Sequence, residues 1–142
     1  MIYKNEFLKE ISFPLGGIGS GCIGLAGNGS LIDWEIFNRP NKGSTNGYSH
    51  IAVKVQINGN TYIKVLNSDL LKDYNGQYSN STFCGFGFGP SAVRMTGFPH
   101  FRSCVFKGEF PIAELEFTDD DFPGKVVLRA FNPLIPLDSK NS

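Results

Sequence analysis

Hydrophobic and polar residues alternate most clearly between positions 51 and 66, in the sequence IAVKVQINGNTYIKVL. Apolar residues occupy every second position from 51 to 57, and the polar segment NGN follows them. A second run rich in β-branched residues extends from 61 to 66. Because Asn-Gly is a strong turn signal between antiparallel strands, the pattern predicts a β-hairpin.

The same alternation returns in the last third of the chain. The sequence SCVFKGEFPIAELEF, residues 103–117, predicts two strands, the second with Ala113, Leu115 and Phe117 on one face and glutamates on the other. The turn residues DDDFPG follow, and KVVLRAF, residues 125–131, predicts a further strand. The whole chain then contains about seven strands and no convincing helix, which is typical of an all-β protein.

A glycine-rich stretch, GGIGSGCIG, occupies residues 16–24, and Gly19, Gly21 and Gly24 fit the spacing G-x-G-x-x-G of dinucleotide-binding loops. That function requires a helix after the loop, because the pyrophosphate binds at the helix N-terminus. Here the sequence LAGNGSLIDWEIFN follows, and its Gly-Asn-Gly turn predicts strand, turn, strand. We therefore expect the glycines to form a tight turn and a close backbone approach, not a phosphate cradle.

A long irregular stretch separates residue 67 from residue 101, and it contains the phenylalanine-glycine sequence FCGFGFGP. Loops of this length are usually functional or mobile. Packing of its phenylalanines on the sandwich is the favoured interpretation. A ligand-binding loop is the alternative.

Composition narrows the class of protein. The chain has 142 residues, 17 of them Gly and 13 Phe, and 13 basic side chains balance 13 acidic ones. This length suits one domain, and the balanced charge argues against a nucleic-acid or anionic-membrane partner found by bulk charge. There is no apolar run long enough to span a membrane and no signal-peptide pattern at the N-terminus.

The three cysteines, Cys22, Cys84 and Cys104, form no C-x-x-C pair. An odd number without metal spacing fits reduced, mostly buried thiols and a cytoplasmic location. A disulfide between two of them is the alternative.

The densest polar cluster is DWEIFNRP, residues 33–40. Asp33 and Glu35 share one face of a predicted strand, about 6.8 Å apart, and glycoside hydrolysis uses carboxylates at such separations. The favoured interpretation is a solvated or Arg39-paired strand face, since a catalytic pair normally comes from different elements. The opposite face would then contribute three residues to the core: Ile32, Trp34 and Ile36.

Other candidate groups lack partners in the sequence. His50 and His100 are isolated from other ligand-type residues, so ordinary hydrogen-bonded histidines are expected in place of a metal site. Ser20, Ser30 and Ser44 have no nucleophile-elbow context. The sequence predicts no metal and no cofactor.

The stretch FPLGGIGSGCIGLAGNGSLIDWEIFNRPNKG, which begins at Phe13, closely resembles the opening of glycoside hydrolase family 116. Further blocks agree, GFPHFRSCVFKGEFPIAELEF and DDDFPGKVVLRAFNPLIPLD, so the resemblance runs to about Asp138. That family includes β-glucosidases and the non-lysosomal glucosylceramidase. The resemblance implies an N-terminal antiparallel β-sandwich that packs on a helical (α/α)₆ barrel, which carries the Glu nucleophile and the Asp acid/base of a retaining mechanism.

No position here matches either catalytic motif of the family, so residues 1–142 are expected to be the N-terminal part of an incomplete sandwich without the barrel. The chain alone is expected to be inactive. Because KVVLRAF and NPLIPL are strongly apolar with only DSKNS after them, we also expect an unpaired strand edge and self-association.

Two functions follow from the resemblance. In the first, the chain is an accessory scaffold for the barrel of an enzyme that acts on β-glucosides or glycolipids. In the second, it is a stand-alone carbohydrate-binding module that stacks sugars on Trp34, Tyr48 and the phenylalanines of 83–88. The candidate contacts to a sugar cleft or to the barrel are the polar cluster: Asp33, Trp34, Glu35, Asn38 and Arg39.

Overall fold

The computed structural model describes residues 1–37, 39–47, 49–69 and 97–142, whose strands form three open sheets. Sheet A has the order β1 (Ile2–Lys4), β8 (Ser103–Glu109), β9 (Ile112–Thr118), β10 (Val126–Phe131). Sheet B has the order β2 (Ser12–Leu15), β3 (Cys22–Ala26), β4 (Leu31–Glu35). Sheet C has the order β5 (Ala52–Ile57), β6 (Asn60–Ser68), β7 (His100–Phe101).

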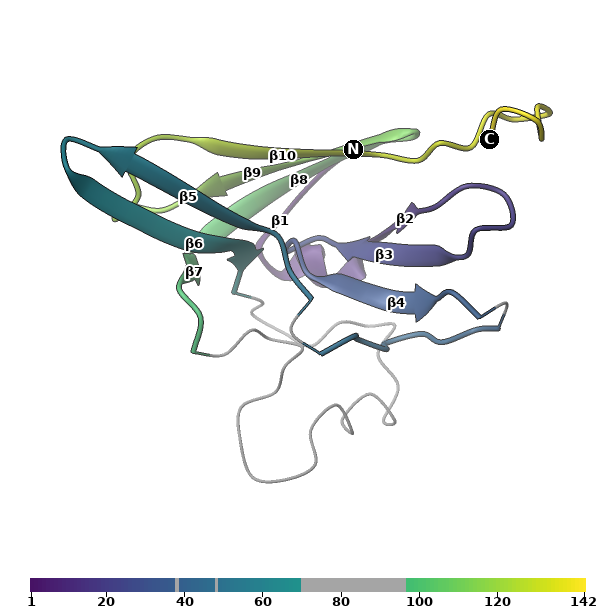
Figure 1. Cartoon of the computed structure of the whole chain (residues 1–142), viewed down its shortest axis with the longest axis horizontal. Coiled ribbons are helices and arrows are strands. Elements are labelled where there is room, and N and C mark those ends of the chain that lie inside the picture. The colour runs from purple at the N-terminus through teal and green to yellow at the C-terminus, as the bar shows by residue number, and fades with distance from the viewer. Residues whose placement is uncertain (38, 48, 70–96) are drawn as a thin grey trace, which may run out of the picture.

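The sheets are arranged in two layers. Sheet A forms one layer, and sheets B and C lie side by side in the other (Figure 1). Neighbouring strands are antiparallel except β6 and β7, which are parallel. The prediction of an all-β, antiparallel sandwich is therefore confirmed, with one parallel pair as an exception.

Apolar side chains between the layers form the core. Ala113, Leu115 and Phe117 on the inner face of β9 are fully buried, whereas the glutamates between them are not. They pack with Phe101 and with residues of the opposite layer such as Leu25. The alternation in the sequence therefore predicted the inner face of β9 correctly, because successive strand residues point to opposite faces.

The predicted hairpins and the last strand are confirmed. Strands β5 and β6 pair from Ala52–Val65 to Ile57–Asn60, strands β8 and β9 form the second hairpin, and β10 pairs with β9 over its whole length. The count of about seven strands is too low, because the described residues contain three strands of only two to four residues: β1, β2 and β7. They also contain a 3₁₀ helix over Asn5–Glu10, which the sequence did not predict.

Both ends of the long irregular stretch form strands. Asn67 and Ser68 end β6, and Phe101 lies in β7 with its side chain in the core. The phenylalanines of 83–88 and the choice between a packed flap and a ligand loop lie outside the described residues.

A buried polar network joins sheets B and C. Asn28, in the turn between β3 and β4, donates from Nδ2 to Asn67 Oδ1 at 2.7 Å and to the Ser68 carbonyl at 2.9 Å. Asn67 Nδ2 in turn donates to Ser30 Oγ at 3.0 Å. Since buried polar groups are costly unless they are hydrogen-bonded, this network fixes how the two sheets meet.

Candidate functional site

The glycine-rich stretch forms the loop between β2 and β3. Gly19 and Gly21 have φ angles of +76° and +79°, a region that other residues rarely adopt. A Cβ on Gly21 would lie 2.7 Å from Ile36 Cα, so only glycine lets the loop approach the end of β4 so closely. Strand β3 follows the loop, then a turn and β4. The predicted strand, turn and strand are confirmed, and no helix N-terminus follows the loop to receive a phosphate.

Asp33 on β4 is the most buried charged residue of the predicted cluster, with only 1% of its surface exposed. Its backbone has φ +51°, and the β3–β4 register shifts between Cys22 and Gly24. Beside this irregularity the side chain is buried against β2 and the segment that follows β4. There Oδ2 accepts hydrogen bonds from Ser12 Oγ at 2.6 Å and from Lys42 Nζ at 3.3 Å, and Oδ1 accepts one from the Gly43 N–H at 2.7 Å.

Glu35 lies at the surface end of the same strand and is half-buried. Its Oε1 accepts from the Asn41 N–H at 3.1 Å, and its Oε2 lies 3.7 Å from Lys42 Nζ. Lys42 therefore bridges Asp33 and Glu35, and the prediction of a solvated or Arg39-paired face is wrong. The cause is the bulge, which buries one carboxylate and places the following loop over both.

The segment 41–44 is fastened to β4 along its length. The Ser44 carbonyl accepts from the Asp33 N–H at 3.0 Å, and Ser44 Oγ accepts from the Trp34 N–H at 2.8 Å. Asn41 Nδ2 donates to the Trp34 carbonyl at 3.1 Å. These bonds hold residues 41–44 against β4, and we call this hydrogen-bonded part of the polar cluster the brace. Two carboxylates that share one cation and face protein donors are poorly suited to act as an acid and a nucleophile.

The remaining members of the cluster differ in exposure. Trp34 is half-buried and its Nε1 donates to the Leu31 carbonyl at 3.2 Å, while Arg39 is exposed. Ile32 is buried as predicted, but Ile36 is 43% exposed because β4 ends at Glu35. Asn38 and Tyr48 lie outside the described residues.

A depression of about 440 Å³ separates the glycine loop from the end of β4 and the residues just after it, Ile36, Phe37, Arg39 and Pro40. Glu35, Arg39 and the exposed side chains of Ile36 and Phe37 line it opposite the glycines. Cys22 also lines it, and burial raises the pKa of its thiol. Sequence reasoning selected the polar residues here but missed the apolar rim. The sequence does contain a signal for these exposed apolar side chains: the apolar pair Ile36–Phe37 directly follows Glu35, where β4 ends.

We call this region the glycine-loop surface and define it by five residues: Ile18, Glu35, Ile36, Phe37 and Arg39. Ile18 projects from the loop and is exposed, and Phe37 is 73% exposed. The segment around Pro133 and Ser142 lies against Gly17, so the end of the described chain borders the same surface. In Figure 1 the β2–β3 loop, the end of β4 and the C-terminus lie at one end of the molecule.

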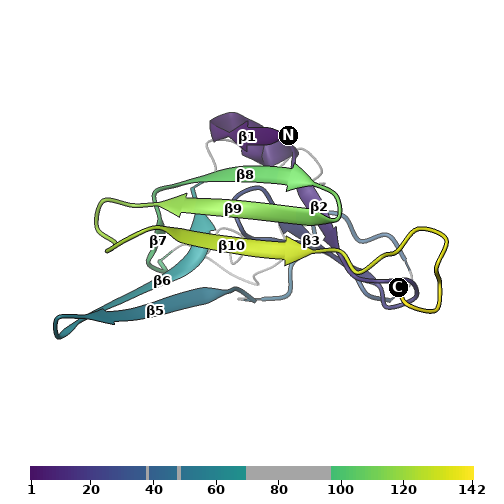
Figure 2. The same cartoon turned by 90° about the horizontal axis from the view of Figure 1, so that it is seen from above.

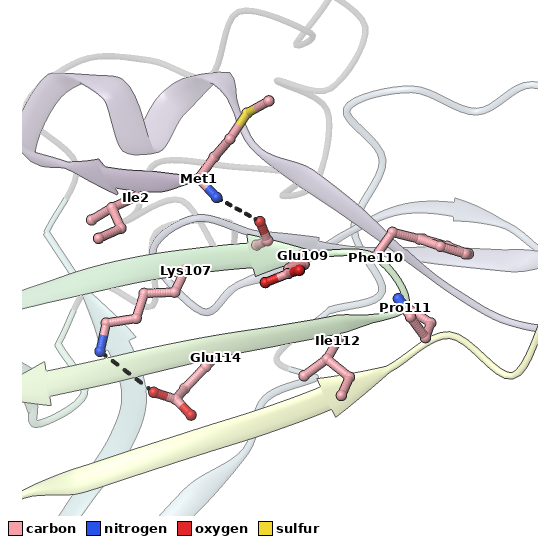
Figure 3. Close-up of a pocket in the computed structure, with 9 residues that line it drawn as sticks. Met1, Ile2, Lys107, Glu109, Phe110, Pro111, Ile112 and Glu114 are labelled. Carbon is pink, nitrogen blue, oxygen red and sulfur yellow. Dashed lines mark hydrogen bonds and ion pairs between the residues drawn. The ribbon is translucent and has the colours of Figure 1, made fainter.

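A second depression, of about 510 Å³, lies at the β8–β9 hairpin (Figure 3). Its wall is mainly apolar, with Met1, Ile2, Phe110 and Ile112. Both cations of its lining are already engaged: Lys107 is paired with Glu114 at 3.5 Å and with Glu116 at 3.2 Å, and the Met1 ammonium donates to the Gly108 carbonyl at 2.9 Å. Those pairs leave few polar groups to orient a ligand.

Both histidines contact other groups of the described chain, and the His50 ring lies 5.4 Å from the Phe98 ring. His100 Nδ1 lies 2.9 Å from the Phe98 carbonyl, and its Nε2 lies 2.9 Å from Asp69 Oδ1. Over the described ranges, three or more His, Cys, Asp or Glu side chains nowhere gather into a metal-binding group. In the same ranges, there is no helix long and apolar enough to cross a membrane.

Comparison with known proteins identifies the family. A family model described as "beta-glucosidase 2, glycosyl-hydrolase family 116 N-term" matches residues 12–142, which include the glycine loop, β4 and sheet A from β8 to β10. A search of curated proteins found no match. Because the family model covers nearly the whole chain, the resemblance noted in the sequence is confirmed, and the chain belongs to glycosyl-hydrolase family 116, whose N-terminal model it matches.

Proposed function

We propose that the chain scaffolds the catalytic part of a retaining β-glucosidase of this family, and that the glycine-loop surface contacts that part. An N-terminal domain of a glycoside hydrolase implies a C-terminal catalytic part. The substrates we propose are β-glucosides or glycolipids. The observation that carries the proposal is that the exposed apolar side chains of Ile36 and Phe37 lie next to a polar cluster fixed by hydrogen bonds.

The chemistry of the described residues favours a scaffold function for this chain and not catalysis. The closest carboxylate pair in the polar cluster, Asp33 and Glu35, shares Lys42 and accepts bonds from backbone N–H groups. Asp33 is enclosed and cannot reach a substrate. A retaining glycosidase needs two carboxyl groups that face each other across a sugar, so we assign catalysis to another part of the enzyme.

The glycine-loop surface has the composition of a contact surface. Aromatic residues and arginine are enriched in protein interfaces, and Phe37 and Arg39 lie close together along the chain here, both exposed. The hydrogen bonds beside them tie Asp33 and Trp34 of β4 to residues 41–44. A preformed surface loses less conformational entropy when it binds.

The test uses an enzyme that contains this domain together with the catalytic part. Phe37→Asp should lower its melting temperature and its turnover of an aryl β-glucoside. Ile63→Asp is the matched control, because Ile63 is also exposed but lies on β6 in sheet C. Equal effects of the two variants would contradict the proposed contact.

The aryl β-glucoside also tests whether this chain alone lacks catalytic activity. Purified residues 1–142 should not hydrolyse an aryl β-glucoside between pH 4 and 8. Turnover that disappears in Asp33→Asn or Glu35→Gln would overturn the scaffold assignment.

A stand-alone carbohydrate-binding module is the second candidate, favoured by Phe37 beside Glu35 and Arg39 at the depression. An aromatic face with a few polar groups is typical of small-ligand sites. Trp34 supports this less than the sequence suggested, because its Nε1 is bonded to the Leu31 carbonyl. Cellobiose should shift the amide NMR signals of the glycine loop if this function is correct, and Phe37→Ala should abolish the shift.

We also propose a cytoplasmic location. Cys22 and Cys104 are free thiols in the structure, and reduced cysteines are typical of intracellular proteins. Alkylation of the protein in intact cells, followed by mass spectrometry, tests whether both thiols stay reduced.

A further inference from the structure

We propose that two copies of this chain pair through the free edge of β10, antiparallel and with Leu128 opposite Leu128 of the second copy. This edge shares no residue with the glycine-loop surface. Strand β10 is the last strand of sheet A, and it pairs only with β9 within the described part of the chain. Figure 2 shows β10 at the margin of that sheet.

The hydrogen-bond phase of β10 determines which groups its free edge presents. The Asn132 N–H donates to the Pro111 carbonyl at 2.8 Å, which extends the β9–β10 ladder by one pair. Hydrogen-bonded and non-hydrogen-bonded pairs alternate in an antiparallel ladder. The even-numbered residues therefore bond to β9, and the N–H and C=O groups of Val127, Arg129 and Phe131 point away from it.

The edge carries little of the usual protection. Native edge strands are guarded by charged side chains, proline, bulges or inward-pointing charges. Residues 126–131, VVLRAF, contain one outward charge, Arg129, which is already paired with Glu114 of β9 at 2.9 Å, and they contain no proline or bulge. On its inner face Val126, Leu128 and Ala130 are only half-buried. On its outer face Val127 is 43% and Phe131 is 70% exposed. A further strand would cover apolar surface on both faces.

Charge selects the register of a second copy. Within one copy, Lys125 is paired with Glu116 at 2.7 Å and Arg129 with Glu114 at 2.9 Å. With Leu128 at the twofold axis, Val127 lies opposite Arg129 and Lys125 lies opposite Phe131, so each of these cations keeps its glutamate and faces an apolar or aromatic side chain of the second copy. Moving the axis to Arg129 places the two arginines opposite each other. Moving it to Val127 places Lys125 opposite Arg129. Like charges directly opposite are destabilising, and this self-complementarity favours a second copy as the occupant.

A proline variant tests the edge. The chain of 15.6 kDa should approach twice that mass as its concentration rises in sedimentation equilibrium. Val127→Pro removes an N–H that points away from β9, so the β9 ladder remains. It should raise the dimer dissociation constant by about tenfold or more. Val127→Thr retains the N–H and should dimerise like the original chain.

Both Val127 variants must keep the same cooperative unfolding at low concentration, which shows that the monomer is intact. A dimer that Val127→Pro leaves unchanged would overturn the proposal. So would a chain that stays monomeric and whose Val127 and Arg129 amides become protected from exchange only in an enzyme with the catalytic part. That second result would assign the edge to a strand of the enzyme instead.

Cysteine crosslinking tests the register independently. Leu128 and its copy form a non-hydrogen-bonded pair with Cα atoms about 4.5 Å apart, within disulfide range. Leu128→Cys should therefore form a covalent dimer under mild oxidation. Ala130→Cys is the matched control, because it also faces inward but lies opposite Val126, about 13 Å from its own copy. Equal crosslinking of both variants would contradict this register.

Discussion

The hydroxyl of Ser12 on β2 donates a 2.6 Å hydrogen bond to the buried carboxylate of Asp33 on β4, across the intervening strand β3. Gly24 of β3 lies beneath this bond. A Cβ on Gly24 would overlap Ser12 Oγ and lie 3.2 Å from Asp33 Oδ2. The outer strands of sheet B are therefore joined over a position that must lack a side chain.

Replacing Gly24 with alanine should destabilise the protein by about 3 kcal/mol, because the methyl group overpacks the site and displaces a hydrogen bond to a charged group. Gly19→Ala is the matched control. Gly19 has φ +76°, but a Cβ added there would meet no atom within 4 Å, so only backbone strain of about 1 kcal/mol applies. Urea unfolding at neutral pH measures both. Equal losses would show that Ser12 and Asp33 do not constrain Gly24.

Asp33→Ala should destabilise the protein by about 2–3 kcal/mol, because Lys42 and the Gly43 N–H lose their buried acceptor. Glu35→Gln should cost less than about 1 kcal/mol, since its ion pair with Lys42 is longer and nearer the surface. Thermal and urea unfolding check the order. A larger loss in Glu35→Gln would show that the brace depends on the outer carboxylate.

The sequence predicted the strands that alternate regularly, and it failed where the backbone departs from regular geometry. The hairpin β8–β9, strand β10 and the hairpin β5–β6 pair in an unbroken antiparallel register, so pattern alone located them. The position of Asp33 depends on a φ of +51° and a register shift that no side-chain pattern encodes. Its partner Lys42 comes from the following loop, and pairing across a loop is not visible from spacing.

Short elements were missed for a related reason. Strand β7 has only two residues, His100 and Phe101, and it exists because β6 provides a parallel partner at Val65 and Ser68. Two residues cannot establish a period. Strand β1 likewise depends on pairing with β8 from Ile2 to Lys4. These elements are determined by tertiary contacts more than by local sequence.

Cys104 should resist alkylation in the folded protein. Burial raises the pKa of its thiol to about 11 despite a hydrogen bond with Ser68, so almost no thiolate is present at about pH 8. Cys22 is less buried and should react faster. Iodoacetamide labelling followed by peptide mass spectrometry gives both rates, and labelling in urea provides the unfolded control. Equal folded and unfolded rates for Cys104 would contradict its burial.

Acid should weaken the junction between sheet C and the β9–β10 loop. The side chain of Asp119 is only 5% exposed, and its Oδ2 accepts from Lys64 Nζ at 2.6 Å and from the Arg102 N–H at 2.9 Å. Burial alone would raise the pKa of Asp119. The hydrogen bonds from Lys64 and from backbone N–H groups outweigh it and lower the pKa from 3.8 to about 2.

A folded-state pKa below the unfolded one means that the unfolded chain binds protons first as the pH falls. The stability contributed by Asp119 is therefore complete above about pH 4 and is lost as the pH falls toward about 2. Asp119→Asn should unfold about 2 kcal/mol more easily at neutral pH, and this difference from the original chain should shrink across that window. Urea unfolding at several pH values measures it. Asp120→Asn, at a neighbouring but exposed carboxylate, should leave the pH profile unchanged. A difference for Asp119→Asn that stays constant down to about pH 2 would show that Lys64 and Asp119 do not form the acid-sensitive junction.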